Sequence, residues 1–189
     1  MNQVNTVANK KYEVIFEGEK YIKNNDGWRR KDFTIPRQNI IVKLNKLLED
    51  VFLKEVENSN YTVEELIKKA DIEKNSKNFV IAERYIKKAI SKSPENLMLY
   101  AKLCSFLREL GKPEEALAET EKIKNYKNSA LSISRAGAMC DLGRYLEAKK
   151  EIAPILASGS TRSKEYAFFI VNRIKKEAPE LYERSDLFE

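Results

Sequence analysis

The stretch from Asn96 to Tyr126 contains two helix-length patterns separated by the short break Gly111-Lys112-Pro113. Glycine ends a helix readily because it accepts a left-handed backbone, and proline begins one readily because the first helical N–H has no internal partner. Apolar residues recur at helical spacing before the break, at Leu99, Leu103, Phe106, Leu107 and Leu110. Two amphipathic helices joined by so short a turn must fold back on each other. The pattern therefore predicts a helix pair in the middle of the chain.

The same pattern occurs on both sides of this pair. Residues 111–116 (GKPEEA) align with residues 143–148 (GRYLEA), and residues 77–82 form an earlier copy without the glycine. The alanines that end the three copies, at positions 82, 116 and 148, are 34 and 32 residues apart. A helix–turn–helix unit with a period of about 34 residues is typical of the tetratricopeptide repeat. One structural unit is therefore repeated along the chain.

On these residues the chain resembles the tetratricopeptide repeat family over roughly residues 61–177. In that family the first helix carries a small residue four positions after a bulky one, and Tyr100 and Cys104 match this pair. Ala116 matches the small residue at which the second helix crosses the first, and Pro94 matches the proline that ends a repeat. The resemblance implies about three repeats.

Two residues depart from the family pattern. Arg135 stands where leucine is usual, and Thr120 stands where an aromatic residue is usual. The second and third repeats also lack the final proline. These departures affect the geometry of a groove more than the assignment of repeats.

The predicted fold is mostly α, a tetratricopeptide-type helical solenoid of about three repeats plus capping helices, with a small N-terminal antiparallel β segment. Its predicted parts are a disordered N-terminus (1–11), a β meander (12–36), a capping helix (37–60), repeats with a C-terminal capping helix (61–177) and a tail (178–189). The predicted helices of the repeats are 63–73, 78–92, 95–110, 113–125, 129–142, 145–157 and 162–176. Thr62 and Glu65 form a capping box that sets the start of the first of these helices.

The residue content argues against an enzyme. The chain has no histidine, which removes the usual general base, the commonest metal ligand and any nucleophile–histidine pair. No glycine-rich phosphate loop follows a strand. The acidic pairs Glu64-Glu65 and Glu114-Glu115 stand at helix starts, where they favour the helix dipole. We expect no catalysis, no cofactor and no metal.

Composition and charge indicate a cytoplasmic protein. No apolar run approaches the length of a membrane span, and the first residues lack the hydrophobic core of a signal peptide. The net charge of +6 is spread along the chain, so no basic stripe is visible. Cys104 and Cys140 are too far apart in sequence for a zinc or redox motif, and we expect them to be buried free thiols.

The resemblance implies that the first helices of the repeats line a concave groove that holds a peptide or helix of another protein. Carried over by alignment, the groove residues are Ile67, Asp71, Met98, Ala101, Ser105, Arg108, Ile133, Gly137, Cys140, Ala167, Val171 and Ile174. Arg108 is the clearest charge among them. Gly137 indicates close approach either of a ligand backbone or of a neighbouring helix. The leading hypothesis is therefore a protein–protein adaptor or scaffold.

Two alternatives stay open. Trp28, Arg29, Arg30 and Lys31 could stack on a base and hold phosphate, as in a nucleic-acid-associated protein, or Trp28 could be the core of the small sheet beside a solvated basic strand. The other alternative is a structural role, in which the groove is filled by the chain's own N-terminal helix or by a second copy in a homo-oligomer.

The repeat register can be tested at Ala116, which marks the tight crossing of the central pair. We expect Ala116→Leu to overpack this crossing and to lower the free energy of unfolding by about 1–3 kcal/mol, measured by thermal or urea denaturation. An unchanged thermal midpoint would show that the register is wrong.

Overall fold

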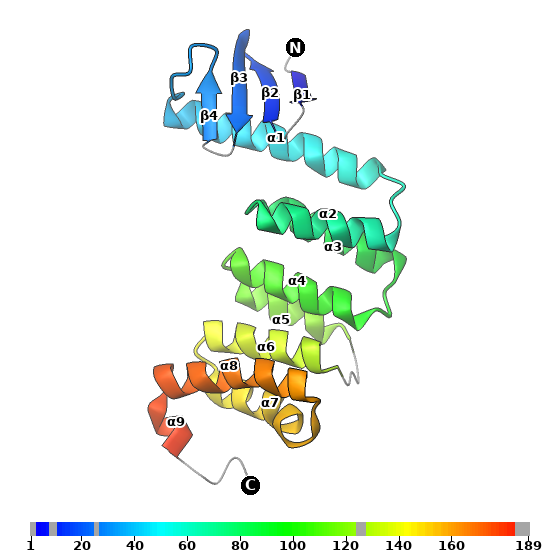
Figure 1. The fold of residues 1–189 in the computed structure, drawn as a ribbon, viewed down its shortest axis with the longest axis vertical. Coiled ribbons are helices and arrows are strands. Elements are labelled where there is room, and N and C mark those ends of the chain that lie inside the picture. The colour runs from blue at the N-terminus through cyan, green and yellow to red at the C-terminus, as the bar shows by residue number, and fades with distance from the viewer. Residues whose placement is uncertain (1–2, 8–10, 25–26, 124–127, 184–189) are drawn as a thin grey trace. The chain divides into compact units, whose positions relative to one another are not determined.

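The structure is a computed structural model that describes residues 3–7, 11–24, 27–123 and 128–183 (Figure 1). The chain is mostly helical and divides into two compact units, Met1–Asn60 and Tyr61–Glu189. This boundary falls at the predicted break between the N-terminal helix and the first repeat.

The first unit contains an antiparallel sheet with the strand order β1-β2-β3-β4. Its strands are β1 (Gln3–Val7), β2 (Lys11–Phe16), β3 (Glu19–Asn24) and β4 (Gly27–Arg30). Glu17 and Gly18 both have positive φ, at 52° and 81°, as a tight two-residue hairpin turn requires. The predicted antiparallel β segment is therefore confirmed.

Two boundaries of the predicted β segment are wrong. Residues 3–7 were expected to be disordered but form β1. Val4 of β1 pairs with Val14, so β1 covers the otherwise open edge of β2. Residues 1–2 and 8–10 lie outside the described part. The last strand ends at Arg30, before the predicted end of the β segment at residue 36, because the Asp32 carboxylate accepts hydrogen bonds from the backbone N–H (3.1 Å) and hydroxyl (2.7 Å) of Thr34. Such a local side-chain turn competes with strand pairing.

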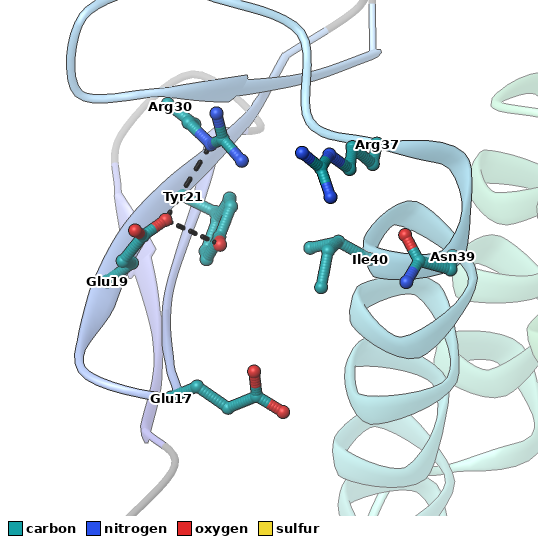
Figure 2. Close-up of a pocket in the computed structure, with 7 residues that line it drawn as sticks. All are labelled: Glu17, Glu19, Tyr21, Arg30, Arg37, Asn39 and Ile40. Carbon is teal, nitrogen blue, oxygen red and sulfur yellow. Dashed lines mark hydrogen bonds and ion pairs between the residues drawn. The ribbon is translucent and has the colours of Figure 1, made fainter.

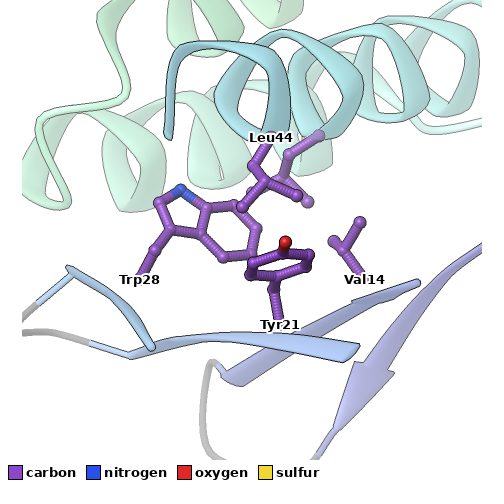
Figure 3. Close-up of a cluster of buried hydrophobic side chains, with 5 residues drawn as sticks. Val14, Tyr21, Trp28 and Leu44 are labelled. Atoms are coloured by element: carbon purple, nitrogen blue, oxygen red, sulfur yellow. The ribbon is translucent and has the colours of Figure 1, made fainter. Parts of the chain in front are cut away.

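Helix α1 (Gln38–Asn58) packs on this sheet. The buried cluster between them consists of Val14, Tyr21, Trp28, Leu44 and Leu48 (Figure 3). Trp28 is only 3% exposed, and its indole Nε1 donates a hydrogen bond to Asn45 Oδ1 at 2.7 Å. So short a sheet buries little by itself, and α1 supplies the apolar face that it needs. A role for α1 as a cap over the repeats stays a prediction.

The second unit is helical throughout its described elements. They are α2 (Val63–Asn75), α3 (Phe79–Lys92), α4 (Leu97–Glu109), α5 (Pro113–Glu121), α6 (Ser129–Asp141), α7 (Tyr145–Ser158), α8 (Thr161–Glu177) and α9 (Pro179–Glu183). The capping box is confirmed, since Thr62 Oγ1 accepts from the Glu65 N–H and Glu65 accepts from the Thr62 N–H. Helix α5 ends four residues earlier than predicted, before residues 124–127, which lie outside the described part.

Successive helices of this unit contact one another, and α4, α6 and α8 also contact directly (Figure 1). Gly111 and Gly143 follow α4 and α6 with φ of 71° and 69°, as expected for glycines that end helices. The three aligned alanines at positions 82, 116 and 148 are completely buried. Equivalent sequence positions thus have equivalent environments, while a tetratricopeptide-type solenoid stays a prediction.

The two residues that depart from the family pattern contact each other. Arg135 on α6 donates from Nη1 to the Thr120 hydroxyl of α5 at 2.7 Å, and its Nε lies 3.4 Å from Glu151 Oε1 on α7. The Thr120 side chain is completely buried and its hydroxyl donates back to the Leu117 carbonyl. A polar connection therefore joins α5, α6 and α7.

We expect Thr120 and Arg135 to be energetically coupled. Thr120→Val and Arg135→Met should each lower stability, because each leaves a polar partner unsatisfied, by about 1–3 kcal/mol. The double variant should lose less than the sum, with a coupling of about 0.5–3 kcal/mol in urea denaturation. Thr120→Val combined with Arg84→Met, an exposed position, is the additive control. Additivity of the first pair would contradict the coupling.

Candidate partner-binding surface

The predicted groove residues fall into two groups by exposure. The accessible group consists of Met98, which is 51% exposed, and the half-buried Ile67, Asp71, Ser105, Arg108 and Ile133. The buried group consists of Ala101, Gly137, Cys140, Ala167, Val171 and Ile174. The buried group cannot meet a partner, so these six positions correct the predicted site. Because α4 packs directly on α6 and α6 on α8, side chains on their facing sides become core.

Gly137 provides room for a neighbouring side chain. A Cβ at this position would collide with the guanidinium of Arg108, which crosses from α4 over α6. Arg108 Nε then donates to Asp141 Oδ2 at 2.6 Å, one turn further along α6. The glycine therefore serves a contact between helices, and the charge of Arg108 is neutralised by that contact.

Further polar contacts join the first helices of the predicted repeats. Lys102 Nζ of α4 donates to Asp71 of α2 at 2.7 Å, and Arg173 of α8 donates to Asp141 of α6. Arg173 also binds Glu177, which accepts at 3.0 Å from the hydroxyl of Tyr145. We call this series, Asp71–Lys102 and Arg108–Asp141–Arg173–Glu177, the ion-pair ladder. It links α2 to α4 and α4 to α6 and α8.

The ladder keeps the carboxylates of Asp141 and Glu177 charged. Partial burial alone would raise the pKa of Asp141, but hydrogen bonds from Arg108 and Arg173 outweigh it, and the pKa lies below its ordinary value of 3.8. The hydrogen bond from Arg173 lowers the pKa of Glu177. Burial opposes the charge of Arg173, yet its bonds to these two carboxylates raise its pKa. Each member of the series Arg108–Asp141–Arg173–Glu177 therefore meets an opposite charge.

The cysteines are buried and free, as predicted. Burial raises the pKa of Cys104 and of Cys140 to about 11. Cys104 Sγ lies 3.3 Å from the carbonyl of Ser134 on α6 and donates to it. The thiol form therefore prevails near neutral pH, which makes both poor nucleophiles. Within the described residues, no group of acidic and cysteine side chains could hold a metal ion.

The first unit contains a cavity of about 290 Å³ between the sheet and the start of α1 (Figure 2). Its lining residues are Glu17, Glu19, Tyr21, Arg30, Arg37, Asn39 and Ile40. Glu19 accepts a hydrogen bond from the Tyr21 hydroxyl at 2.8 Å and lies 3.6 Å from Arg30 Nε. Two carboxylates thus balance the two guanidinium groups, and the lining has no net charge.

Of the two alternatives for Trp28, the core of the small sheet is confirmed, because its indole is buried in the cluster under α1 and is not accessible for stacking on a base. Arg29 Nη1 donates to the carbonyl of Trp28 at 2.9 Å, and Arg30 faces Glu19. Lys31 alone of the basic run is exposed. The sequence predicts this core role as one of the two alternatives, since a single tryptophan in a small sheet usually forms its core.

In comparison with known proteins, no family model and no curated protein matches this chain. Among the described residues, no helix combines the length and the apolar character needed to cross a bilayer.

From the ion-pair ladder we predict that Asp141 contributes to the stability of the fold and that this contribution is lost in acid. A carboxyl group with a lowered pKa stabilises the fold above its ordinary pKa, and this stability is lost as the pH falls through its folded pKa. We expect Asp141→Asn to lower the free energy of unfolding by about 1 kcal/mol at pH 7, and this difference to shrink at acid pH, below the ordinary pKa of 3.8. Circular dichroism during urea unfolding measures both values.

The exposed Asp50 of α1 is the control for Asp141. Asp50→Asn should show no difference from the parent chain at either pH. A pH-independent effect of Asp141→Asn would contradict a stabilising charge at this position.

Proposed function

We propose that the protein is a non-catalytic cytoplasmic adaptor whose repeats bind a peptide or helix of another protein. In this proposal α2, α4, α6 and α8 are the first helices of a tetratricopeptide-type solenoid. The observation that carries the proposal is the regular spacing of contacts. Asp71–Lys102, Arg108–Asp141, Asp141–Arg173 and Tyr145–Glu177 join residues 31, 33, 32 and 32 positions apart. Contacts separated by one repeat are what the stacking of identical units produces.

The binding surface in this proposal consists of the accessible groove residues. Met98 is the most exposed of them, and the half-buried Ile67 and Ile133 supply further apolar area. The ion-pair ladder pairs Asp71 and Arg108 with neighbouring helices, so these charges contribute little to selection of a partner. Apolar side chains exposed beside paired charges are typical of interaction sites. This surface favours a partner segment with apolar side chains.

The proposal can be tested by affinity capture from native cell extract followed by mass spectrometry. Met98→Glu combined with Ile133→Glu should abolish capture of the partner, because two charges would have to be buried at the interface. Helical content, measured by circular dichroism, should stay unchanged. If the double variant loses both its helical content and its capture of the partner, these side chains belong instead to the core.

Two matched variants serve as controls. Leu146→Glu changes another exposed apolar residue, on α7, and should retain capture. Replacing Arg29, Arg30 and Lys31 by alanine should reduce capture only slightly, and capture should depend weakly on salt. Loss of binding in the alanine variant, with a steep fall of binding as salt rises, would replace the adaptor by the nucleic-acid alternative.

A further inference from the structure

Helix α8 exposes a large aromatic surface. Phe168 and Phe169 are 52% and 69% exposed, and the ring of Tyr166 lies 6.5 Å from that of Phe169. The buried residues of α8, at 167, 170, 171 and 174, lie on the other side of the helix. Positions 165, 168, 169 and 172 share one helical face, which we call the end face of α8.

The same face is covered on the two preceding first helices. Phe168 follows Cys104 and Ala136 at intervals of 32 residues, and both of these are completely buried. The residue that covers Cys104 is known, because its thiol donates to the Ser134 carbonyl of the next first helix, α6. Helix α8 in turn contacts α6. On α4, therefore, the next helix lies along the face that α8 leaves open, and on α6 the equivalent residue is buried in a helix that α8 contacts.

We propose that the end face of α8 is a second docking surface, which binds an amphipathic helix of a different protein. Continuity with the α4–α6–α8 packing argues for a helix as the occupant. The charges argue for its chemistry: the exposed Arg162 and Lys176 stand on the same stripe as Phe169, 14 residues apart. At 1.5 Å per residue they are about 21 Å apart along the helix. A complementary helix has an apolar face with acidic residues near both ends.

These cations disfavour a second copy of this chain as the occupant. If two α8 helices packed antiparallel across Phe169, each Arg162 would face Lys176 of the second copy. If they packed parallel, each cation would face its own equivalent. Like charges meet in either orientation, which costs free energy. Glu165 is the one acidic residue of the end face. In the antiparallel pair it would face neither Arg162 nor Lys176 of the second copy, so it would not offset this repulsion.

The probe for this site is a synthetic helical peptide of about 20 residues with leucines along one face and two glutamates 14 positions apart. A matched peptide has lysines in place of the glutamates. In fluorescence anisotropy with the full chain, the glutamate peptide should bind at least about tenfold more tightly than the lysine peptide. Phe168→Ser with Phe169→Ser should weaken its binding at least about tenfold. Arg162→Glu with Lys176→Glu should reverse the preference between the peptides.

Two control variants separate this site from other surfaces. Phe33→Ser changes an exposed phenylalanine of the first unit and should leave peptide binding unchanged. Met98→Glu should also leave peptide binding unchanged. The proposal for the end face is therefore tested independently of the proposal for the groove. Circular dichroism must show unaltered helical content in the Phe168→Ser, Phe169→Ser variant.

Three results would overturn the proposal. The first is equal affinity for both peptides, and the second is binding that survives the Phe168→Ser, Phe169→Ser change. The third is a dimer in sedimentation equilibrium that the glutamate peptide does not dissociate and that the same double change abolishes. This last result would assign the end face to a second copy.

Discussion

The helical unit depends on direct contacts between alternate helices, of α4 with α6 and of α6 with α8. A single helix pair of this size cannot bury its apolar face alone, so each pair needs the next one to complete its core. The ion-pair ladder fixes how α4, α6 and α8 meet, and its geometry depends on Gly137, which leaves room for Arg108 to reach Asp141. A further contact between residues 32 positions apart lies at the end of the unit, where Lys149 Nζ donates to the Leu181 carbonyl of α9 at 3.0 Å.

Polar groups in this interior are compatible with stability because they are satisfied. Thr120 is completely buried, yet its hydroxyl bonds to both the Leu117 carbonyl and Arg135. Lys149 is almost completely buried and its amine has a carbonyl partner. Removing the partner of a buried polar group is strongly destabilising, and a shifted register would do this. These contacts therefore select one alignment of the helices, which an apolar interface of leucines and alanines would define less strictly.

Local patterns explain what could be predicted from the sequence. The helix starts at Thr62 and Pro113, the glycine-ended helices and the burial of the cysteines follow from short-range spacing alone. The groove residues were less predictable, because sequence spacing identifies a helix face without showing what packs against it. Cys140 and Val171 lie on first helices as expected but are buried between them. β1 could not be predicted from its own weak pattern, since pairing with the edge of β2 defines it.

Side-chain size along the stack explains why α8 differs from the helices before it. Helix axes lie about 8–10 Å apart, and small residues at the contact permit the closer approach. Cys104 and Ala136 are small, so α6 and α8 can pack closely on the helices that carry them. Phe168 occupies the equivalent place on α8 and would hold a further helix at a greater distance. A helix packed against Phe168 would therefore meet α8 differently from the way α6 meets α4, and a surface of large aromatic side chains suits an occupant with its own sequence and charge pattern.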